Sequence, residues 1–314
     1  MGEFKGIKII STGGARGSRE VSNDEIAVKA ATTDQWIRER TGICSRNFCC
    51  AEETATGLVM KAARQALEGS GLRPEDIGLC INATMTPEFA TPSTACLIQA
   101  ELGLREDMAA FDLNAACSGF LYALETARGL MYLKDIDYAL VTASEKFSDI
   151  LDFTDYGTAI LFGAGAGAVV IGRSDRPFYS LEGSRGSRVI WANGPGPEPT
   201  VLHMQGRQVF KFATTTIEAS VKRLLQESGL EIGDIDHFVF HQANERIIDF
   251  VASRMKLDPE KVHKNISTTG NTSAASIPLL LDDLARQGVF KEGERIMSVG
   301  FGGGLTWAGI LMEW

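Results

Sequence analysis

The sequence lacks a segment that would cross a membrane. No part of its 314 residues reaches the ~18 consecutive uncharged apolar residues that a spanning helix needs. Residues 1–14 do not combine the basic start, apolar run and small-residue cleavage site of a secretory signal peptide. We therefore expect a cytoplasmic protein that does not associate with membranes.

Cysteine pairs are also scarce. Six cysteines in a chain of this length are too few for a disulfide framework. The adjacent Cys49 and Cys50 face no second Cys or Cys/His pair at the spacing that zinc sites use. We therefore expect free thiols, at most one of them reactive, and no metal ion.

The chain has no excess of positive charge. Its formal net charge is -9 at pH 7, whereas general binding to nucleic acid or anionic membranes needs clustered positive charge to neutralise phosphates. This balance argues against both kinds of partner and leaves room only for local basic patches.

What the sequence does contain is a duplication. Residues 70–81 recur at 228–240 with the same Ser-Gly-Leu start, Asp-Ile pair and apolar run. Each copy follows an amphipathic segment with helical spacing. Shorter repeats follow in the same order, at 127–128 and 285–286 and again at 162–165 and 301–304.

These repeats divide the chain into two related α/β units, an N-terminal half of residues 1–173 and a C-terminal half of residues 174–314. Runs such as 138–142 and 237–240 are apolar without alternation, which is typical of strands buried on both faces by helices. Two such sheets packed through shared helices would form a layered α/β/α/β/α body. Active sites in such folds gather where strand ends meet helix starts.

Cys117 lies at such a junction. Residues 112–120 end a strand-like stretch and lead into a predicted helix over 121–132, and the small neighbours of Cys117 permit a sharp turn. The N–H groups and dipole of a helix start stabilise a thiolate, which predicts a thiol pKa below the ordinary value of ~8.5. Local context leaves two interpretations open, a nucleophile and a buried structural cysteine.

His241 and Asn271 lie at comparable junctions in the second half. His241 ends the strand-like run 237–240, and Asn271 comes shortly before a predicted helix over 279–287. Taken alone, a hydrogen-bonded core histidine and a turn or capping asparagine remain open for them. The pseudo-symmetry of the two halves would bring the helix starts near Cys117 and Asn271 to one pocket.

Two glycine-rich segments resemble nucleotide sites only superficially. Residues 162–168 fit a G-x-G-x-x-G/A pattern, but a strand-like run follows where the dinucleotide fingerprint needs a helix start. The pattern therefore disfavours a nicotinamide or flavin cofactor. Glycines such as those at 302–304 would instead let backbone N–H groups approach a substrate closely, as an oxyanion hole requires.

Together these residues resemble the β-ketoacyl-acyl carrier protein synthase III family of the thiolase superfamily. The resemblance extends over nearly the whole chain and is carried by segments 34–43, 114–120, 241–244, 270–276 and 301–307. It implies a thiolase-like, duplicated five-layer α/β/α/β/α fold. It also implies a homodimer that forms through the first-half sheet, with residues 87–99 near the contact.

The resemblance implies an acyltransferase that initiates fatty acid synthesis without a cofactor. Cys117 would take the acyl group of an acyl-CoA primer, and the N–H groups of Cys117 and Gly303 would stabilise the oxyanion. His241 and Asn271 would then bind the thioester carbonyl of malonyl-acyl carrier protein. Loss of carbon dioxide would leave an enolate that attacks the acyl-cysteine, so coenzyme A enters only as the substrate thioester.

Further roles follow from the same resemblance. The tunnel for coenzyme A would be lined by Thr32, Trp36, Arg40, Tyr156 and Asn244. A basic patch for the acidic carrier protein would consist of Lys211, Arg246 and Lys256, for which solvated surface charge remains the alternative. Thr91 would face the acyl pocket.

Three positions depart from the family pattern. Tyr156 stands where an arginine commonly covers the adenine of coenzyme A, so we expect weaker or altered coenzyme A recognition. Thr91 replaces a frequent phenylalanine, which would leave room for longer or branched primers. Ala164 replaces a usual aspartate, and we assign this change no functional consequence.

Two other functions remain open at this stage. A related condensing enzyme or acyltransferase of polyketide or secondary metabolism would pass an unusual primer to a different acceptor. A cysteine thioester hydrolase would use Cys117 and His241, although its mechanism explains neither Asn271 nor the duplication.

Overall fold

The computed structural model describes residues 6–194 and 197–314, and residues 1–5 of the predicted N-terminal half lie outside the described part. Its first sheet has the strand order β1-β7-β6-β4-β5. The strands are β1 (Gly6–Arg16), β4 (Ile77–Ala83), β5 (Ala109–Leu113), β6 (Tyr138–Lys146) and β7 (Ala164–Ser174). The neighbours β5, β4 and β6 run parallel, and β7 and β1 are antiparallel to the strands they pair with.

The second sheet repeats this pattern with the order β11-β12-β13-β8. Its strands are β8 (Phe178–Ser187), β11 (His237–Phe240), β12 (Arg295–Gly302) and β13 (Gly304–Glu313). β11 and β12 are parallel, and β13 and β8 are antiparallel to their neighbours. β11, β12, β13 and β8 thus correspond to β4, β6, β7 and β1, which is the duplication that the sequence predicts.

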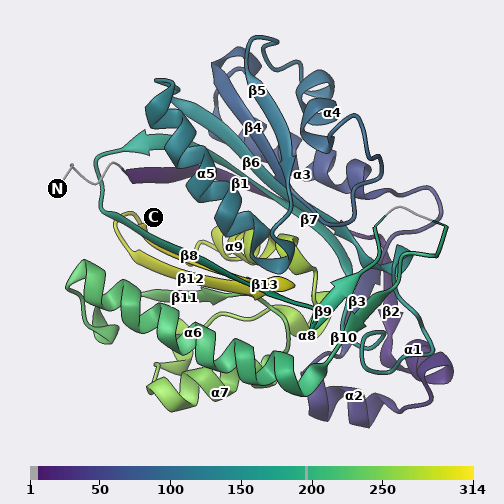
Figure 1. Ribbon diagram of the computed structural model, residues 1–314. Coiled ribbons are helices and arrows are strands. Elements are labelled where there is room, and N and C mark those ends of the chain that lie inside the picture. The colour runs from purple at the N-terminus through teal and green to yellow at the C-terminus, as the bar shows by residue number, and fades with distance from the viewer. Residues whose placement is uncertain (1–5, 195–196) are drawn as a thin grey trace.

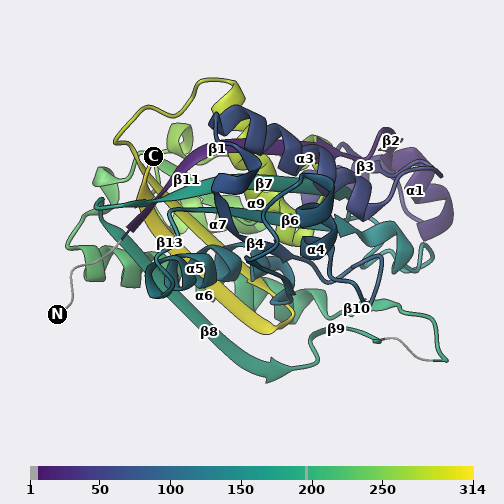
Figure 2. The same cartoon turned by 90° about the horizontal axis from the view of Figure 1, so that it is seen from above.

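Helices fill the layer between the sheets and cover both outer faces, as Figures 1 and 2 show. The middle layer contains α5 (Gly119–Leu133) and α9 (Ser276–Arg286). The outer layers contain α3 (Ala55–Ser70) and α4 (Thr94–Glu101) on the first sheet, and α6 (Gly206–Ser228) and α7 (Glu245–Met255) on the second. The predicted five-layer α/β/α/β/α fold is therefore confirmed.

The two central helices are buried because apolar side chains occupy most of their surface. Phe120 and Leu121 of α5 and Ile277 and Leu280 of α9 are each about 1 % exposed and belong to one core cluster with residues of both sheets. Burial of such side chains stabilises the fold by roughly 1.5–3 kcal/mol each. The core thereby fixes the first turns of α5 and α9 relative to each other.

The remaining elements form a cap at one end of the layers, on the right in Figure 1. They are α1 (Asn23–Ala30), α2 (Asp34–Thr41), α8 (Ile266–Thr269), β2 (Arg19–Ser22), β3 (Ser45–Phe48), β9 (Ile190–Ala192) and β10 (Leu202–Met204). α2 begins at the side-chain cap of Thr33, which accepts a hydrogen bond from the Trp36 N–H, and ends at Gly42 with φ 76°.

Six short 3-10 helices connect these elements in the described ranges. They are η1 (Pro74–Asp76), η2 (Ala116–Ser118), η3 (Phe147–Asp149), η4 (Ile232–Asp234), η5 (Pro259–Lys261) and η6 (Ser273–Ala275). Of these, η2 and η6 lead directly into α5 and α9 and pack against each other. Within the described residues, no helix is long and apolar enough to traverse a bilayer.

Candidate active site

A single cavity of about 1410 Å³ contains the three residues that the sequence singles out for chemistry. Cys117, His241 and Asn271 all line it, together with Gly303. Cys117 comes from η2, His241 follows the carboxyl end of β11, and Asn271 lies between α8 and η6. The structure therefore brings together residues from both halves of the chain, as the pseudo-symmetry predicts.

Matching strained turns position this site. Ala116, which precedes Cys117, has φ 48°, and Ser273, two residues after Asn271, has φ 52°. Left-handed backbone at a non-glycine residue costs on the order of 1 kcal/mol or more, and it persists where the surrounding packing enforces it. Each turn is the first residue of the 3-10 helix that leads into a buried central helix, so the core holds both in place.

The Cys117 thiol is protonated in this environment. Burial raises its pKa to about 12, and the hydrogen-bond contact between Ser273 Oγ and Sγ, at 3.2 Å, opposes this only in part because the hydroxyl can donate to a thiolate. The sequence-based expectation of a pKa below ~8.5 is therefore wrong, because loss of hydration outweighs the helix-start effect in the closed site. Attack by this sulfur requires a group that accepts its proton.

His241 is a neutral hydrogen-bond donor. It is 1 % exposed, and burial lowers its pKa to about 3. Its Nδ1 lies 2.6 Å from Ser276 Oγ, which also accepts the Gln242 N–H at 3.4 Å. The Ser276 hydroxyl therefore donates to Nδ1, and the ring proton resides on Nε2. Within the described residues Nε2 has no acceptor, so it is available to a substrate.

Asn271 supplies a second donor. Its side-chain Oδ1 accepts the Ser273 N–H at 2.8 Å, which fixes the orientation of the amide. The Nδ2 group has no acceptor in the described part of the chain. Main-chain bonds to Leu161 and Gly163 hold the residue against the segment that follows η3.

The turn between β12 and β13 approaches the nucleophile closely. A Cβ at Gly302 would lie 2.6 Å from the Cys117 backbone N, so only glycine fits there. The next residue, Gly303, lines the cavity. The turn therefore brings main-chain groups to the cysteine, as the predicted oxyanion hole requires.

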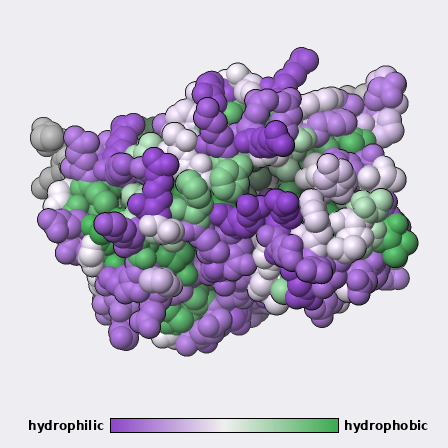
Figure 3. Space-filling model, turned by 90° about the horizontal axis from the view of Figure 1, so that it is seen from below, coloured by the Kyte–Doolittle hydropathy of each residue, from purple (hydrophilic) through white to green (hydrophobic). Residues whose placement is uncertain are grey.

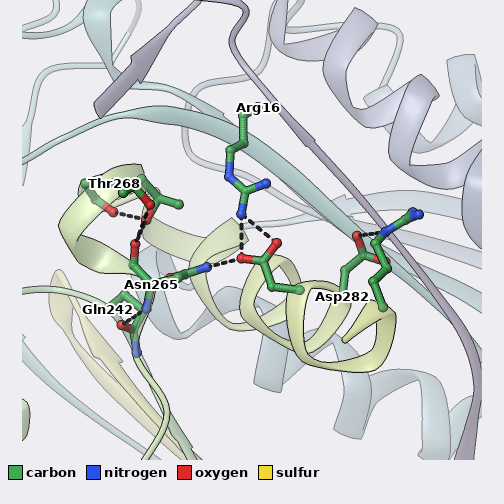
Figure 4. Close-up of polar contacts among 9 residues, drawn as sticks. Arg16, Gln242, Asn265, Thr268 and Asp282 are labelled. Atoms are coloured by element: carbon green, nitrogen blue, oxygen red, sulfur yellow. Dashed lines mark hydrogen bonds and ion pairs between the residues drawn. The ribbon is translucent and has the colours of Figure 1, made fainter. Parts of the chain in front are cut away.

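A polar network behind the site joins the segments that carry His241 and Asn271, as Figure 4 shows. Arg16 of β1 pairs with Asp283 of α9 at 2.6 Å, and Asp283 accepts a bond from Asn265 Nδ2 at 2.8 Å. The Asn265 N–H donates to Gln242 Oε1 at 3.2 Å. The network thus connects the residue after the histidine with the start of the short helix that precedes the asparagine.

The mouth of the cavity holds four of the five predicted coenzyme A residues. Trp36, Arg40, Tyr156 and Asn244 line it, whereas Thr32 does not. The Trp36 and Tyr156 rings lie 5.7 Å apart at 83°, and the Arg40 guanidinium lies 5.8 Å from the Trp36 ring centroid. The two aromatic rings therefore meet edge to face and leave no parallel slot between them.

The other predicted residues lie on the surface. Lys211 on α6 and Arg246 on α7 are exposed, as is Lys256 just after α7. None of the three forms an ion pair within the described ranges. Figure 3 shows the face formed by α6 and α7, where hydrophilic residues surround apolar patches. Thr91 is also exposed and does not line the cavity of the single chain, although the adjacent Ala90 does.

Sequence reasoning missed three side chains that contact the candidate catalytic residues directly or through one hydroxyl. These are Ser273, Ser276 and Glu145. Glu145 could have been found, because a carboxylate that ends the apolar run of β6 is an unusual feature of a buried strand. The two serines had no such signal. In the described residues, no group of three or more His, Cys, Asp or Glu side chains is placed to hold a metal ion.

Two protein-family models match segments of this chain. The family model of 3-oxoacyl-[acyl-carrier-protein] synthase III matches residues 111–185, and that of its C-terminal domain matches residues 225–314. The β-ketoacyl-[acyl-carrier-protein] synthase III of Clostridium acetobutylicum is 41 % identical, with 98 % of both chains covered.

Solved structures agree with this assignment. The 3-oxoacyl-[acyl-carrier-protein] synthase III of Aquifex aeolicus superimposes with a TM-score of 0.93 at 38 % identity, covering 98 % of this chain and 100 % of the other. The priming β-ketosynthase of the R1128 polyketide biosynthetic pathway has a TM-score of 0.93 at 35 % identity, covering 100 % and 97 %. The chain therefore belongs to the β-ketoacyl-[acyl-carrier-protein] synthase III family of thiolase-fold condensing enzymes.

Proposed function

We propose that the protein condenses an acyl-CoA primer with malonyl-acyl carrier protein and thereby initiates fatty acid synthesis. The observation that carries this proposal is the meeting of one thiol and two neutral donors, Cys117, His241 and Asn271, in a single cavity. Decarboxylation generates the carbanion, so the reaction needs donors directed at an enolate oxygen and no cofactor.

In the first half-reaction, Cys117 attacks the primer carbonyl and forms an acyl-cysteine while coenzyme A leaves. The N–H groups of Cys117 and Gly303 would stabilise the oxyanion of the tetrahedral intermediate. The close approach of Gly302 to the Cys117 backbone supports this role for the adjacent residue.

In the second half-reaction, the malonyl thioester carbonyl accepts hydrogen bonds from His241 Nε2 and Asn271 Nδ2. Neither group has another acceptor among the described residues, and the histidine is uncharged because burial holds its pKa at about 3. The hydrogen bonds from both donors strengthen as negative charge develops on the carbonyl oxygen, so they stabilise the enolate more than the substrate. The enolate then attacks the acyl-cysteine, and Cys117 leaves.

Ser276→Ala should slow condensation about 5-fold while leaving acylation of Cys117 within a factor of two, since one ordinary hydrogen bond is worth about 1 kcal/mol. Loss of the hydroxyl removes the donor that keeps the ring proton on Nε2. The two rates can be followed separately by intact mass and by product formation. Equal slowing of both would contradict an effect on the histidine alone.

The mouth residues Trp36, Arg40 and Asn244 would bind the pantetheine and nucleotide of coenzyme A. Asn244 Nδ2 donates to the Arg40 carbonyl at 3.1 Å and so ties α7 to α2 at the opening. Arg40 and Arg207 both line the cavity and offer positive charge for phosphates. Thr32 stays a predicted member of this set.

Tyr156→Arg should tighten coenzyme A binding by roughly 10-fold, since an arginine adds a stacking face and a phosphate partner. Tyr156 is 57 % exposed at the mouth and carries no charge for a phosphate. Calorimetric titration with coenzyme A tests this, with Tyr156→Phe as the control that keeps the ring. Equal affinity of the arginine variant and the parent would show that Tyr156 does not limit recognition.

Two protein partners complete the proposal. The acyl carrier protein would dock on Lys211, Arg246 and Lys256, whose lack of described ion pairs leaves their charge available to an acidic partner. A second copy would pair along the first-half sheet. The edge strand of this sheet, β5, includes the partly exposed Phe111 and Leu113, and Phe89 in the adjacent loop is 47 % exposed. These apolar side chains and the unpaired strand edge offer a surface for a second copy.

The two predicted halves would carry different catalytic groups. We propose that residues 1–173 act as the acyl-accepting half, which carries Cys117, and residues 174–314 as the half that supplies both donors. One sheet is built within residues 6–174 and the other within 178–313, which is consistent with a boundary near Arg173.

A second candidate is a priming enzyme of specialised metabolism. The likeness to the priming β-ketosynthase of the R1128 polyketide pathway favours it, as do the unusual residues Tyr156 and Thr91. Such an enzyme would use the same half-reactions with another primer or acceptor, so primer choice separates the two candidates.

The decisive experiment measures the intact mass of the protein after exposure to acyl-CoAs of increasing length and branching, followed by malonyl-acyl carrier protein. We expect a covalent acyl adduct that disappears as a β-ketoacyl product forms. Free acid without condensed product would instead indicate a thioester hydrolase. Activity with acetyl-CoA alone would contradict the suggested role of Thr91 in admitting longer primers.

A further inference from the structure

Behind the cavity, Glu145 is a buried carboxyl group that the reaction as described does not use. It is 0 % exposed at the end of β6, and the adjacent Lys146 pairs with Asp149. Its partners are neutral: Thr86 Oγ1 donates at 2.5 Å, and the Met85 N–H donates at 3.3 Å. Burial raises its pKa to about 7, so the group exchanges a proton near neutral pH.

Ser273 connects this carboxyl group to the nucleophile. Its Oγ lies 3.2 Å from Cys117 Sγ and also 3.2 Å from Glu145 Oε1. A hydroxyl has one proton to donate, so it cannot donate to both neighbours at once. Since the thiol keeps its own hydrogen at neutral pH, the consistent arrangement is S–H to Oγ and O–H to the ionised carboxylate.

We propose that Glu145 accepts the Cys117 proton through Ser273 when the sulfur attacks an acyl donor. Glu145 is therefore a positioning and proton-holding residue that acts through the serine. This inference rests on the proposed function only for the identity of the acyl donor, because proton removal is needed for any electrophile.

His241 is a poorer acceptor for the same proton. Its Nδ1 is occupied by Ser276, and its pKa of about 3 makes it a much weaker base than Glu145. A general base works best when its pKa lies near the pH of the solution, which favours Glu145 near pH 7. This division leaves His241 as a donor throughout the reaction.

The proton can be followed through both half-reactions. In the first, the bond from Cys117 sulfur to the acyl carbon forms, the thiol proton moves to Ser273 Oγ, and the serine proton moves to Glu145. The carbon–sulfur bond to coenzyme A then breaks, and the coenzyme A thiolate takes a proton from water. In the second, Cys117 leaves as a thiolate and recovers its proton from Glu145 through Ser273.

The test is alkylation of Cys117 by iodoacetamide as a function of pH, because it needs neither coenzyme A nor carrier protein. In the parent protein we expect the rate to rise with a midpoint near pH 7, as Glu145 ionises, and to level off above that pH. Glu145→Gln and Ser273→Ala should both lose the plateau and react more slowly at pH 8, by on the order of 10²-fold. Glu145→Asp should recover part of the plateau.

A purely electrostatic or structural role predicts a different result. The negative charge of Glu145 raises the pKa of Cys117, so its removal by Glu145→Gln would then speed alkylation. Either a faster reaction or an unchanged pH profile in this variant would overturn the proposal. Thr86→Val should shift the rise to higher pH, since the lost hydrogen bond stabilises the ionised carboxylate. An unshifted rise would likewise count against Glu145 as the titrating group.

This design separates two kinds of failure. If no acyl-CoA modifies the protein but the alkylation plateau depends on Glu145, the proposed function fails and the proton relay stands. If acyl transfer occurs at the same rate in Glu145→Gln and the parent from pH 6 to 9, the relay fails and the function stands. Thermal unfolding of each variant verifies that the buried substitution leaves the chain folded.

Discussion

Cys117→Ala should abolish covalent acyl transfer and reduce condensation by at least ~10⁴-fold, a loss of the size expected when a nucleophile is removed. The substitution removes the only thiol that lines the cavity in the described part of the chain. No other cavity-lining side chain in these ranges combines a nucleophilic sulfur with a neighbouring proton acceptor. Intact-mass measurement after exposure to an acyl-CoA should therefore detect no adduct.

The same variant tests whether the two half-reactions use separate groups. His241 and Asn271 are held by Ser276 and Ser273 rather than by the cysteine. Decarboxylation of malonyl-acyl carrier protein should therefore persist in Cys117→Ala. Cys96→Ala is the matched control, because Cys96 is exposed on α4 outside the cavity. A persistent adduct in Cys117→Ala would place the nucleophile elsewhere.

The architecture and the candidate catalytic residues could be predicted because both leave local marks in the sequence. The repeat of residues 70–81 at 228–240 reflects the correspondence of β4 and β11 with their flanking helices. Cys117 and Asn271 each lie shortly before a buried helix, and His241 follows a buried strand. Strand ends and helix starts can be read from periodicity and small residues without knowledge of the packing.

The electrostatics could not be predicted, because they depend on burial by residues distant in sequence. The pKa of Cys117 rises rather than falls once the site is enclosed, which no local pattern around residue 117 indicates. The link from Ser273 to Glu145 spans 128 positions. Likewise, the perpendicular arrangement of Trp36 and Tyr156 follows from the way α2 packs beside the segment after η3.

Asn271→Asp should reduce condensation by ~10²–10³-fold, the usual effect of losing one preorganised donor at a developing oxyanion. The change keeps an oxygen that accepts the Ser273 N–H. It replaces Nδ2, the group that we propose to donate to the substrate, with a second oxygen. An ionised carboxylate there would repel the enolate instead of stabilising it, whereas acylation of Cys117 should stay within a few-fold of the parent.

Asn271→Ala distinguishes lost donation from added repulsion. Alanine removes the donor without introducing charge, so we expect it to retain more condensation than aspartate at pH 8. At lower pH the aspartate can be protonated and donate a hydrogen bond, so its activity should recover as the pH falls, while that of alanine should not. Measuring both rates from pH 5 to 8 tests this, and parallel profiles for the two variants would contradict the assignment of Asn271 as a donor to the enolate.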